Sequence, residues 1–124
     1  MRRIVITGVG CVSALGSSTA TTWAGMREGI SGIGPLTGLD DPTLKTTIAA
    51  QAHSFRAHDH FDDKRLVLLD PVSQFALVAA REAVAQAGLQ LQGEAAERAA
   101  VIIDRKSTRL NSSHSTLSRM PSSA

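Results

Sequence analysis

RRIVITGVGCVSALG, residues 2–16, is the stretch of sequence that decides the fold. Ile4 to Ile6 are consecutive β-branched apolar residues, a run that is typical of a strand buried on both faces. Gly8 and Gly10 end this run, and glycine allows a tight turn, a positive φ or the close approach of another backbone. A buried strand that leads into a glycine-rich turn predicts the opening of an α/β domain.

A nucleotide-binding turn is the alternative interpretation of these glycines. The dinucleotide-binding pattern needs G-x-G-x-x-G at the start of a helix. Here Ser13 stands at the third glycine position, and Leu15-Gly16 interrupts any helix that starts at the turn. No second strand that ends in an acidic residue follows at the required distance. The sequence therefore favours a structural turn, and we expect no cofactor.

The clearest predicted helix spans residues 71–87. Asp70 is a good N-cap, Pro71 suits the first helical position, and Gly88 predicts the end of the helix. Apolar residues recur at spacings of three and four, and many of them are alanines that permit the close approach of a neighbouring element. We expect the polar residues Arg81, Glu82 and Gln86 to lie together on another side of the helix.

Weaker signals predict the remaining elements. They are a helix over 19–28 anchored in the core by Trp23, a loop over 31–36, a strand within 46–52, a helical turn near 66–69, a polar connector over 94–98 and a buried strand over 99–103. The order β, α, β, α, β predicts a layered α/β domain.

The tail, residues 104–124, differs from the rest of the chain. It is polar, rich in serine and without apolar periodicity, and it resembles the in-frame translation of a sequencing adapter. We therefore expect a domain over 1–103 and a non-native tail over 104–124 that makes no stable contacts with it. Without the tail, nine basic residues face ten acidic ones, so the net charge of +2 gives no argument for a nucleic-acid partner.

Metal and disulfide chemistry find little support in the sequence. Cys11 is the single cysteine. A loop carries several potential metal ligands, namely His53, His58, Asp59, His60, Asp62 and Asp63, but their spacing matches no zinc pattern, so a solvated loop is expected. No apolar run approaches the length of a membrane span, and a cytoplasmic location is the default expectation.

Taken together, these residues resemble the N-terminal part of the β-ketoacyl-acyl carrier protein synthases, closest to the synthase I/II branch. The resemblance runs almost continuously over residues 2–103. The matching segments are 3–10, 12–16, Trp23, 29–33, Asp70, 74–83, 87–89 and 101–103. Their joint order and spacing are more specific than any one of them.

The resemblance implies an incomplete, thiolase-like αβαβα fold that is dimeric, as a homodimer or a heterodimer, in the intact protein. It also implies an acyltransferase of fatty acid or polyketide synthesis, which condenses an acyl thioester with malonyl-acyl carrier protein by decarboxylative Claisen condensation. A cysteine at a helix N-terminus captures the acyl group, because a helix N-terminus stabilises a thiolate. That cysteine and two catalytic histidines match no residue of this chain, so the fragment is expected to be inactive, and Cys11 is expected to be an inert thiol.

The family also implies a surface for the acidic carrier protein just before the long helix. Lys64 matches a basic position there, with Arg65 beside it, whereas Val67 and Leu68 stand where relatives often carry further basic residues. Ordinary solvated charges beside Asp62 and Asp63 are the alternative interpretation. A fragment of a non-catalytic partner subunit, which shares the fold but lacks the cysteine, is the alternative to an enzyme.

Overall fold

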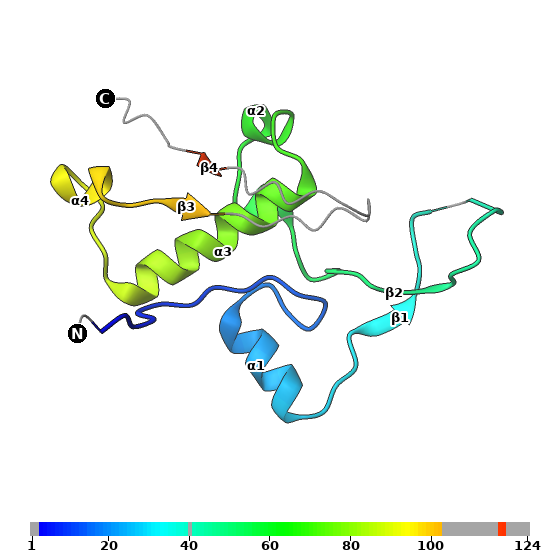
Figure 1. The fold of residues 1–124 in the computed structure, drawn as a ribbon. Helices are drawn as coiled ribbons and strands as arrows, with labels where there is room; N and C mark the ends of the chain where they lie inside the picture. Colours follow the sequence, from blue (N-terminus) through cyan, green and yellow to red (C-terminus); the bar gives the residue numbers. More distant parts are fainter. Residues whose placement is uncertain (1–2, 40, 103–116, 119–124) are drawn as a thin grey trace. The chain divides into compact units, whose positions relative to one another are not determined.

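A computed structural model describes residues 3–39, 41–102 and 117–118, which belong to two compact units, Met1–Gly88 and Leu89–Ala124. The described residues combine helices with short strands (Figure 1). The first unit holds α1 (Thr19–Arg27), β1 (Ile33–Pro35), β2 (Ile48–Ala50), the 3-10 turn η1 (Ala57–Asp59), α2 (Asp63–Leu66) and α3 (Pro71–Ala87), and the second holds α4 (Glu94–Glu97), β3 (Val101–Ile102) and β4 (Leu117–Ser118). None of the described helices is long and apolar enough to cross a membrane.

The long helix α3 forms as its sequence predicts. The Asp70 carboxylate accepts a hydrogen bond of 2.7 Å from the Ser73 amide, and Pro71 occupies the first turn. Gly88 ends the helix in the left-handed conformation, with a φ of 62°, which glycine adopts without the steric cost of a Cβ atom. Both ends of α3 are therefore determined by residues within its own sequence.

The helix α1 also forms, but its packed face differs from the expectation. The Ser18 side chain caps it, and Thr21 completes a capping box. Trp23 is 61% exposed and is not the core anchor, whereas Thr22 and Gly25 are buried. The packed side of α1 faces the tight turn at 13–16: the Thr22 hydroxyl lies 2.9 Å from that of Ser13, and a Cβ atom at Gly25 would lie 3.3 Å from the Leu15 side chain, so small residues face this turn.

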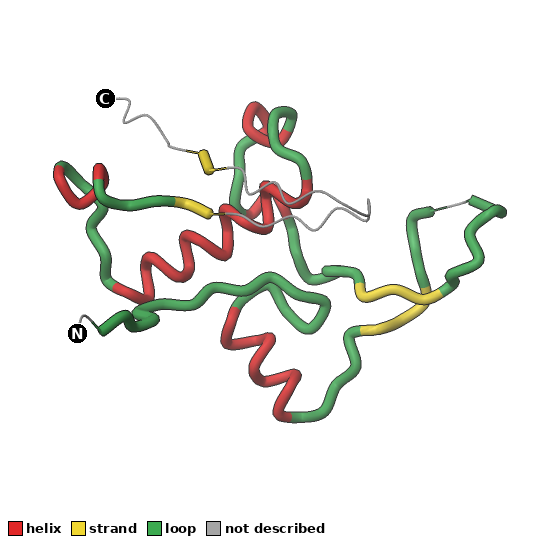
Figure 2. The backbone as a smooth tube through the Cα atoms, in the orientation of Figure 1, coloured by secondary structure: helices red, strands yellow, loops and turns green. Residues whose placement is uncertain are grey.

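The opening segment forms no strand among the described residues, contrary to the expectation for Ile4–Ile6. These residues are well exposed, with Ile4 at 98% and Ile6 at 87%. The segment instead runs as a loop beside α3 (Figure 2). A strand needs a hydrogen-bonding partner along its edge, and the described residues supply none beside Ile4–Ile6.

The strand expected within 46–52 is confirmed as β2, and its partner is β1. The two pair antiparallel, with Ile33 opposite Ala50 and Pro35 opposite Ile48. The prediction of a loop over 31–36 was therefore wrong. Pro35 has no backbone N–H to donate. It is tolerated because each strand of this two-stranded ribbon has a free edge, where no hydrogen bond from that position is needed.

Few apolar side chains are buried among the described residues. Phe61 and Val78 are the buried apolar ones, at 6% and 8% exposure. Phe55 packs edge-on against Phe75 with ring centroids 4.8 Å apart. Arg81 lies over the Phe61 ring, 5.0 Å from its centroid. This aromatic cluster connects the segment before α2 to α3.

The second unit departs from the sequence expectations in three ways. The expected connector over 94–98 contains the short helix α4. The strand β3 is exposed rather than buried, with Val101 at 45% and Ile102 at 71%. It pairs antiparallel with β4, so described residues of the tail do contact residues before 103. Ile103, which ends the expected strand, and tail residues 104–116 and 119–124 lie outside the described residues.

Candidate functional site

The Glu82 carboxylate joins three parts of the first unit. One of its oxygens accepts a hydrogen bond of 3.0 Å from the Cys11 amide, and the other accepts one of 2.8 Å from the Thr19 amide. Thr19 is the first residue of α1, so a side chain of α3 satisfies one of the free N–H groups at the α1 N-terminus. Glu82 therefore fixes the opening segment and α1 to α3.

The electrostatics of Glu82 agree with this role. Partial burial raises the pKa of its carboxyl, but the hydrogen bonds from Cys11 and Thr19 stabilise the charged form. Their combined effect is larger, so the pKa lies below the ordinary value for glutamate. The contact is thus made by an ionised carboxylate at neutral pH.

Gly8 and Gly10 let the opening segment approach α3 at backbone distance. A Cβ atom at Gly8 would collide with the Ala83 carbonyl, and one at Gly10 would collide with the Ala79 carbonyl. Between these glycines, the Val9 amide donates a hydrogen bond of 2.7 Å to the Gln86 side chain. Of the roles that glycine permits, close approach is the one used here, because neither Gly8 nor Gly10 has a positive φ.

This arrangement argues against the nucleotide-binding alternative. A phosphate-binding turn needs free backbone N–H groups that point at the ligand. The amides of Val9 and Cys11 are already bonded to Gln86 and Glu82. The glycine turn is therefore an attachment point for α3 in the described part of the chain.

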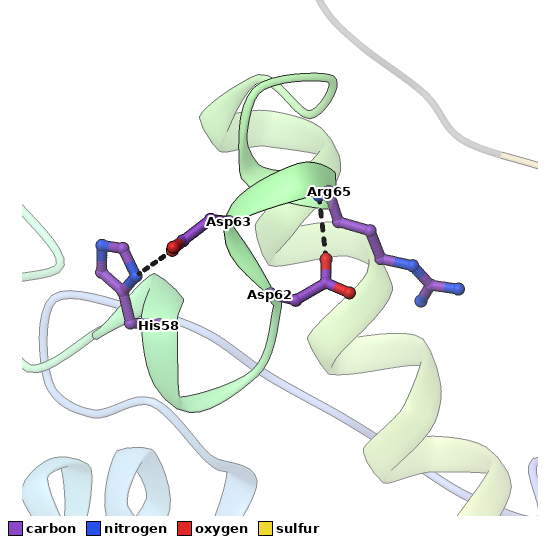
Figure 3. A network of polar contacts seen from close by, with 4 residues as sticks. All are labelled: His58, Asp62, Asp63 and Arg65. Carbon is purple, nitrogen blue, oxygen red and sulfur yellow. Dashed lines mark hydrogen bonds and ion pairs between the residues drawn. The ribbon is translucent and has the colours of Figure 1, made fainter.

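The two residues expected to dock a carrier protein lie on α2, a single helical turn. The Asp62 carboxylate caps this turn by accepting a hydrogen bond of 2.9 Å from the Arg65 amide. Lys64 and Arg65 are both exposed, and no ion pair holds either side chain within the described ranges. Figure 3 shows the Arg65 guanidinium extending away from the neighbouring histidine–aspartate pair. The two cations are accessible to a partner.

That neighbouring pair consists of His58 and Asp63, whose Nδ1 and Oδ1 atoms lie 3.4 Å apart. Both side chains are well exposed, so the pair contributes little to stability. His58 thus lies near one of the carboxylates singled out in the sequence. Nowhere in residues 3–39, 41–102 and 117–118 do three or more His, Cys, Asp or Glu side chains group as a metal site.

Cys11 lies in the loop between Gly10 and the turn at 13–16, and not at a helix N-terminus. Its thiol is partly buried. The position therefore lacks the helix that would stabilise a thiolate.

Sequence reasoning missed the role of Glu82 and Gln86, which it placed away from the packed face of α3. A signal was present in the sequence. Ala79, Glu82, Ala83 and Gln86 recur at helical spacing and therefore share one face of the helix. The two alanines leave room for another backbone to approach this face. The side chains of Glu82 and Gln86 can accept hydrogen bonds from the amides of that backbone.

Comparisons with known proteins agree with one family. The family model described as "Beta-ketoacyl synthase, N-terminal domain" matches residues 1–121. The 3-oxoacyl-[acyl-carrier-protein] synthase 2 of Staphylococcus aureus (strain N315) is 37% identical over 102 residues, which cover 82% of this chain and 25% of the relative. Nodulation protein E of Rhizobium sp. (strain N33) is 42% identical over 102 residues, with the same coverage. The chain spans about a quarter of the length of the curated relatives that it matches.

Proposed function

Because the chain belongs to the β-ketoacyl synthase family, as an N-terminal domain, we propose that it is part of a 3-oxoacyl-[acyl-carrier-protein] synthase. Such an enzyme condenses an acyl thioester with malonyl-acyl carrier protein by decarboxylative Claisen condensation. The family match over residues 1–121 is the observation that carries this proposal. The fold of the whole protein is then the thiolase-like αβαβα architecture.

In this proposal the chain supplies scaffold and not catalytic groups. The nucleophilic cysteine and the two histidines of the family match no position in it, and Cys11 lacks the helix N-terminus that would activate a thiol. Glu82 would hold the opening segment against α3, as its hydrogen bonds to Cys11 and Thr19 support. The fragment alone is inactive.

The surface of α2 is proposed to contact the acyl carrier protein through Lys64 and Arg65. Their exposure, and the lack of ion-pair partners for them among the described residues, support this role. Exposed basic residues attract an acidic partner and mainly accelerate its association. A dimeric assembly of the intact protein is part of the same proposal.

The domain division is also a proposal, namely a condensing-enzyme domain over 1–103 and a non-native tail over 104–124. The polar composition of the tail and its likeness to a translated adapter support it. Genomic sequence from an independent library tests it: different codons after Ile103 are expected. The same 21 residues in native DNA would show that the tail is natural.

The test of function is the intact gene product that contains residues 1–103. We expect a cysteine at the family's nucleophile position, stoichiometric labelling of that cysteine by an acyl donor, and release of CO₂ from malonyl-acyl carrier protein. Another residue at that position, together with activity only after a second subunit is added, would favour the non-catalytic partner subunit. No activity and no acylation in either setting would contradict the proposal.

A further inference from the structure

The β1–β2 ribbon has a free outer edge on each strand, and the edge of β2 offers backbone donors. The Leu36 amide donates a hydrogen bond of 2.9 Å to the Thr47 carbonyl, so these two residues form a hydrogen-bonded pair at the end of the ladder. Bonded and non-bonded pairs alternate along an antiparallel ladder. Ile48 and Ala50 therefore belong to non-bonded pairs and direct their N–H and C=O groups to the outer edge. Neither amide has a hydrogen-bond partner in the described part of the chain.

The outer edge of β1 offers no donor of this kind. Pro35 has no backbone N–H, and the Ile33 amide already donates a hydrogen bond of 3.2 Å to the Ser31 hydroxyl oxygen. An added strand needs donors as well as acceptors along the edge that receives it. Of the two edges of this ribbon, that of β2 is therefore the one that can accept another strand.

The ribbon also exposes an apolar face. Alternate residues of a strand lie on one face, and residues opposite each other across the ladder share that face. The exposed members are Ile33, Pro35, Ile48 and Ala50, with Ile33 at 61% and Ile48 at 58% exposure. A two-stranded ribbon is marginally stable in water, whereas a third strand with an apolar face stabilises it. The ribbon therefore lacks a strand that brings apolar side chains to this face.

The chain itself carries a segment with these properties. Ile4–Ile6 is a run of exposed β-branched residues, and its amides make no hydrogen bond with the described residues. In its own copy, the residues that follow it are fixed to α3 by the amides of Val9 and Cys11, and no pairing with β2 forms among the described residues. A second copy of the chain is therefore the partner that supplies the missing strand.

We propose that Ile4–Ile6 of one copy adds to the outer edge of β2 in a second copy, as an antiparallel third strand. Ile4 then pairs with Ala50 and Ile6 pairs with Ile48, and each pair exchanges both of its backbone hydrogen bonds. The side chains of Ile4 and Ile6 extend the apolar face of the ribbon. This contact does not depend on the proposed enzyme activity.

Charge selects the antiparallel direction. In that direction Arg3 lies opposite the uncharged Gln51, whereas a parallel strand would bring Arg3 toward Lys45. Val5 falls on the other face, opposite the small Ala49. The contact joins different surfaces of the two copies, so each copy can receive one neighbour and supply another. Association therefore continues beyond two copies unless the ends meet in a ring.

Complementary variants of the full chain test this contact by sedimentation velocity over a range of concentrations. The unchanged chain should associate as its concentration rises. Ile4→Lys with Ile6→Lys removes the added strand, and Ala50→Lys places a charge on the receiving edge, so each variant alone should associate about tenfold more weakly. Mixed in equal amounts, the two variants retain one intact segment and one intact edge, and they should form a 1:1 complex.

Ile33→Lys is the matched control, because it adds the same charge to the same apolar face but on the strand whose edge offers no donor. This chain should associate like the unchanged one. A monomeric unchanged chain, no complex in the mixture, or an equal loss of association in the Ile33→Lys chain would overturn the proposal.

A peptide of residues 3–8 with blocked ends keeps the test valid if a variant fails to fold, because it is added to the unchanged chain. It should dissociate the assembly by occupying the edge of β2. N-methylation of Ile4 and Ile6 removes the amides that face β2 and should weaken this competition about tenfold, whereas N-methylation of Val5, whose amide faces away, should not weaken it. Equal competition by the two methylated peptides, or none by the unmodified peptide, would show that this backbone pairing does not form.

Discussion

Replacing Glu82 with glutamine tests the contact that joins the opening segment and α1 to α3. The carboxylate accepts hydrogen bonds from Cys11 at 3.0 Å and from Thr19 at 2.8 Å, one on each oxygen. A glutamine keeps the shape but has one carbonyl oxygen, so one of the two amides must face an NH₂ group. Hydrogen bonds to a charged group contribute about 1.5–3 kcal/mol each, and partial exposure here reduces the expected loss to about 1–2 kcal/mol.

Amide hydrogen exchange is the appropriate assay, because it reports local opening residue by residue. A loss of this size predicts that the amides of Cys11 and Thr19 exchange about 5–30 times faster in the Glu82→Gln chain. Amides in the middle of α3 should change much less. Glu97→Gln, an exposed carboxylate of the second unit, is the matched control and should leave both amides unchanged.

The pH dependence supplies a second readout with a definite sign. The pKa of Glu82 is lower in the folded chain than its ordinary value, so its stabilising contribution is present above about pH 4.3 and is lost as the pH falls through the lower, folded pKa. Protection of the Cys11 and Thr19 amides, corrected for intrinsic exchange, should fall in that acid range. In the glutamine chain the same protection should not respond to this titration. Equal protection in the two chains at neutral pH would refute the reasoning.

Three further predictions concern the opening segment. Gly10→Ala should separate the segment from α3 at a cost of about 1–3 kcal/mol, seen as lost protection of the Cys11 amide, whereas Gly34→Ala, where a Cβ meets nothing within 4 Å, should not affect that amide. Ile4→Lys with Ile6→Lys should reduce self-association in sedimentation velocity, and a chain that is already monomeric at high concentration would contradict this. A labelled acyl donor should not acylate Cys11 stoichiometrically at neutral pH, and mass spectrometry that finds such an adduct would show an activated thiol.

Features with local causes could be predicted from the sequence. Asp70, Pro71 and Gly88 determine both ends of α3 within a few residues of the bonds that they make. The capping of α1 by Ser18 is equally local. A cap needs only the amides of the next turn, which the sequence itself supplies. Such signals hold whatever surrounds the helix.

Features that depend on distant partners could not be predicted in the same way. Trp23 was expected in the core and is exposed, because the side chains that pack against the 13–16 turn are small. Pro35 suggested a loop, yet residues more than ten positions away complete a strand pair with it. Glu82 was expected away from the packed face of α3, but the amides of Cys11 and Thr19, which lie far from it in the sequence, donate hydrogen bonds to its carboxylate. In each case the deciding atom lies on another element.

The candidate docking residues fall between these two classes. The family resemblance places Lys64 and Arg65, and the structure adds that both are exposed on a capped turn. The resemblance could not say on which side Val67 and Leu68 lie, because their substitution departs from the family pattern. Only the half-buried state of the neighbouring leucines distinguishes an outward apolar pair from a core pair.

Ile4–Ile6 are exposed because no described element packs against them, whereas the residues that follow them contact α3. Val9 and Cys11 are two residues apart, so in an extended segment their amides point to the same side, and α3 occupies that side. Attachment to α3 therefore begins at Val9 and leaves the apolar run before it without a partner. The chain spans about a quarter of its relatives' length, and a layered α/β fold covers such a run with strands and helices on both sides. In the proposed fold that cover comes from segments other than the described ones, and Ile4 and Ile6, at 98% and 87%, are accordingly the most exposed large apolar residues that the structure describes.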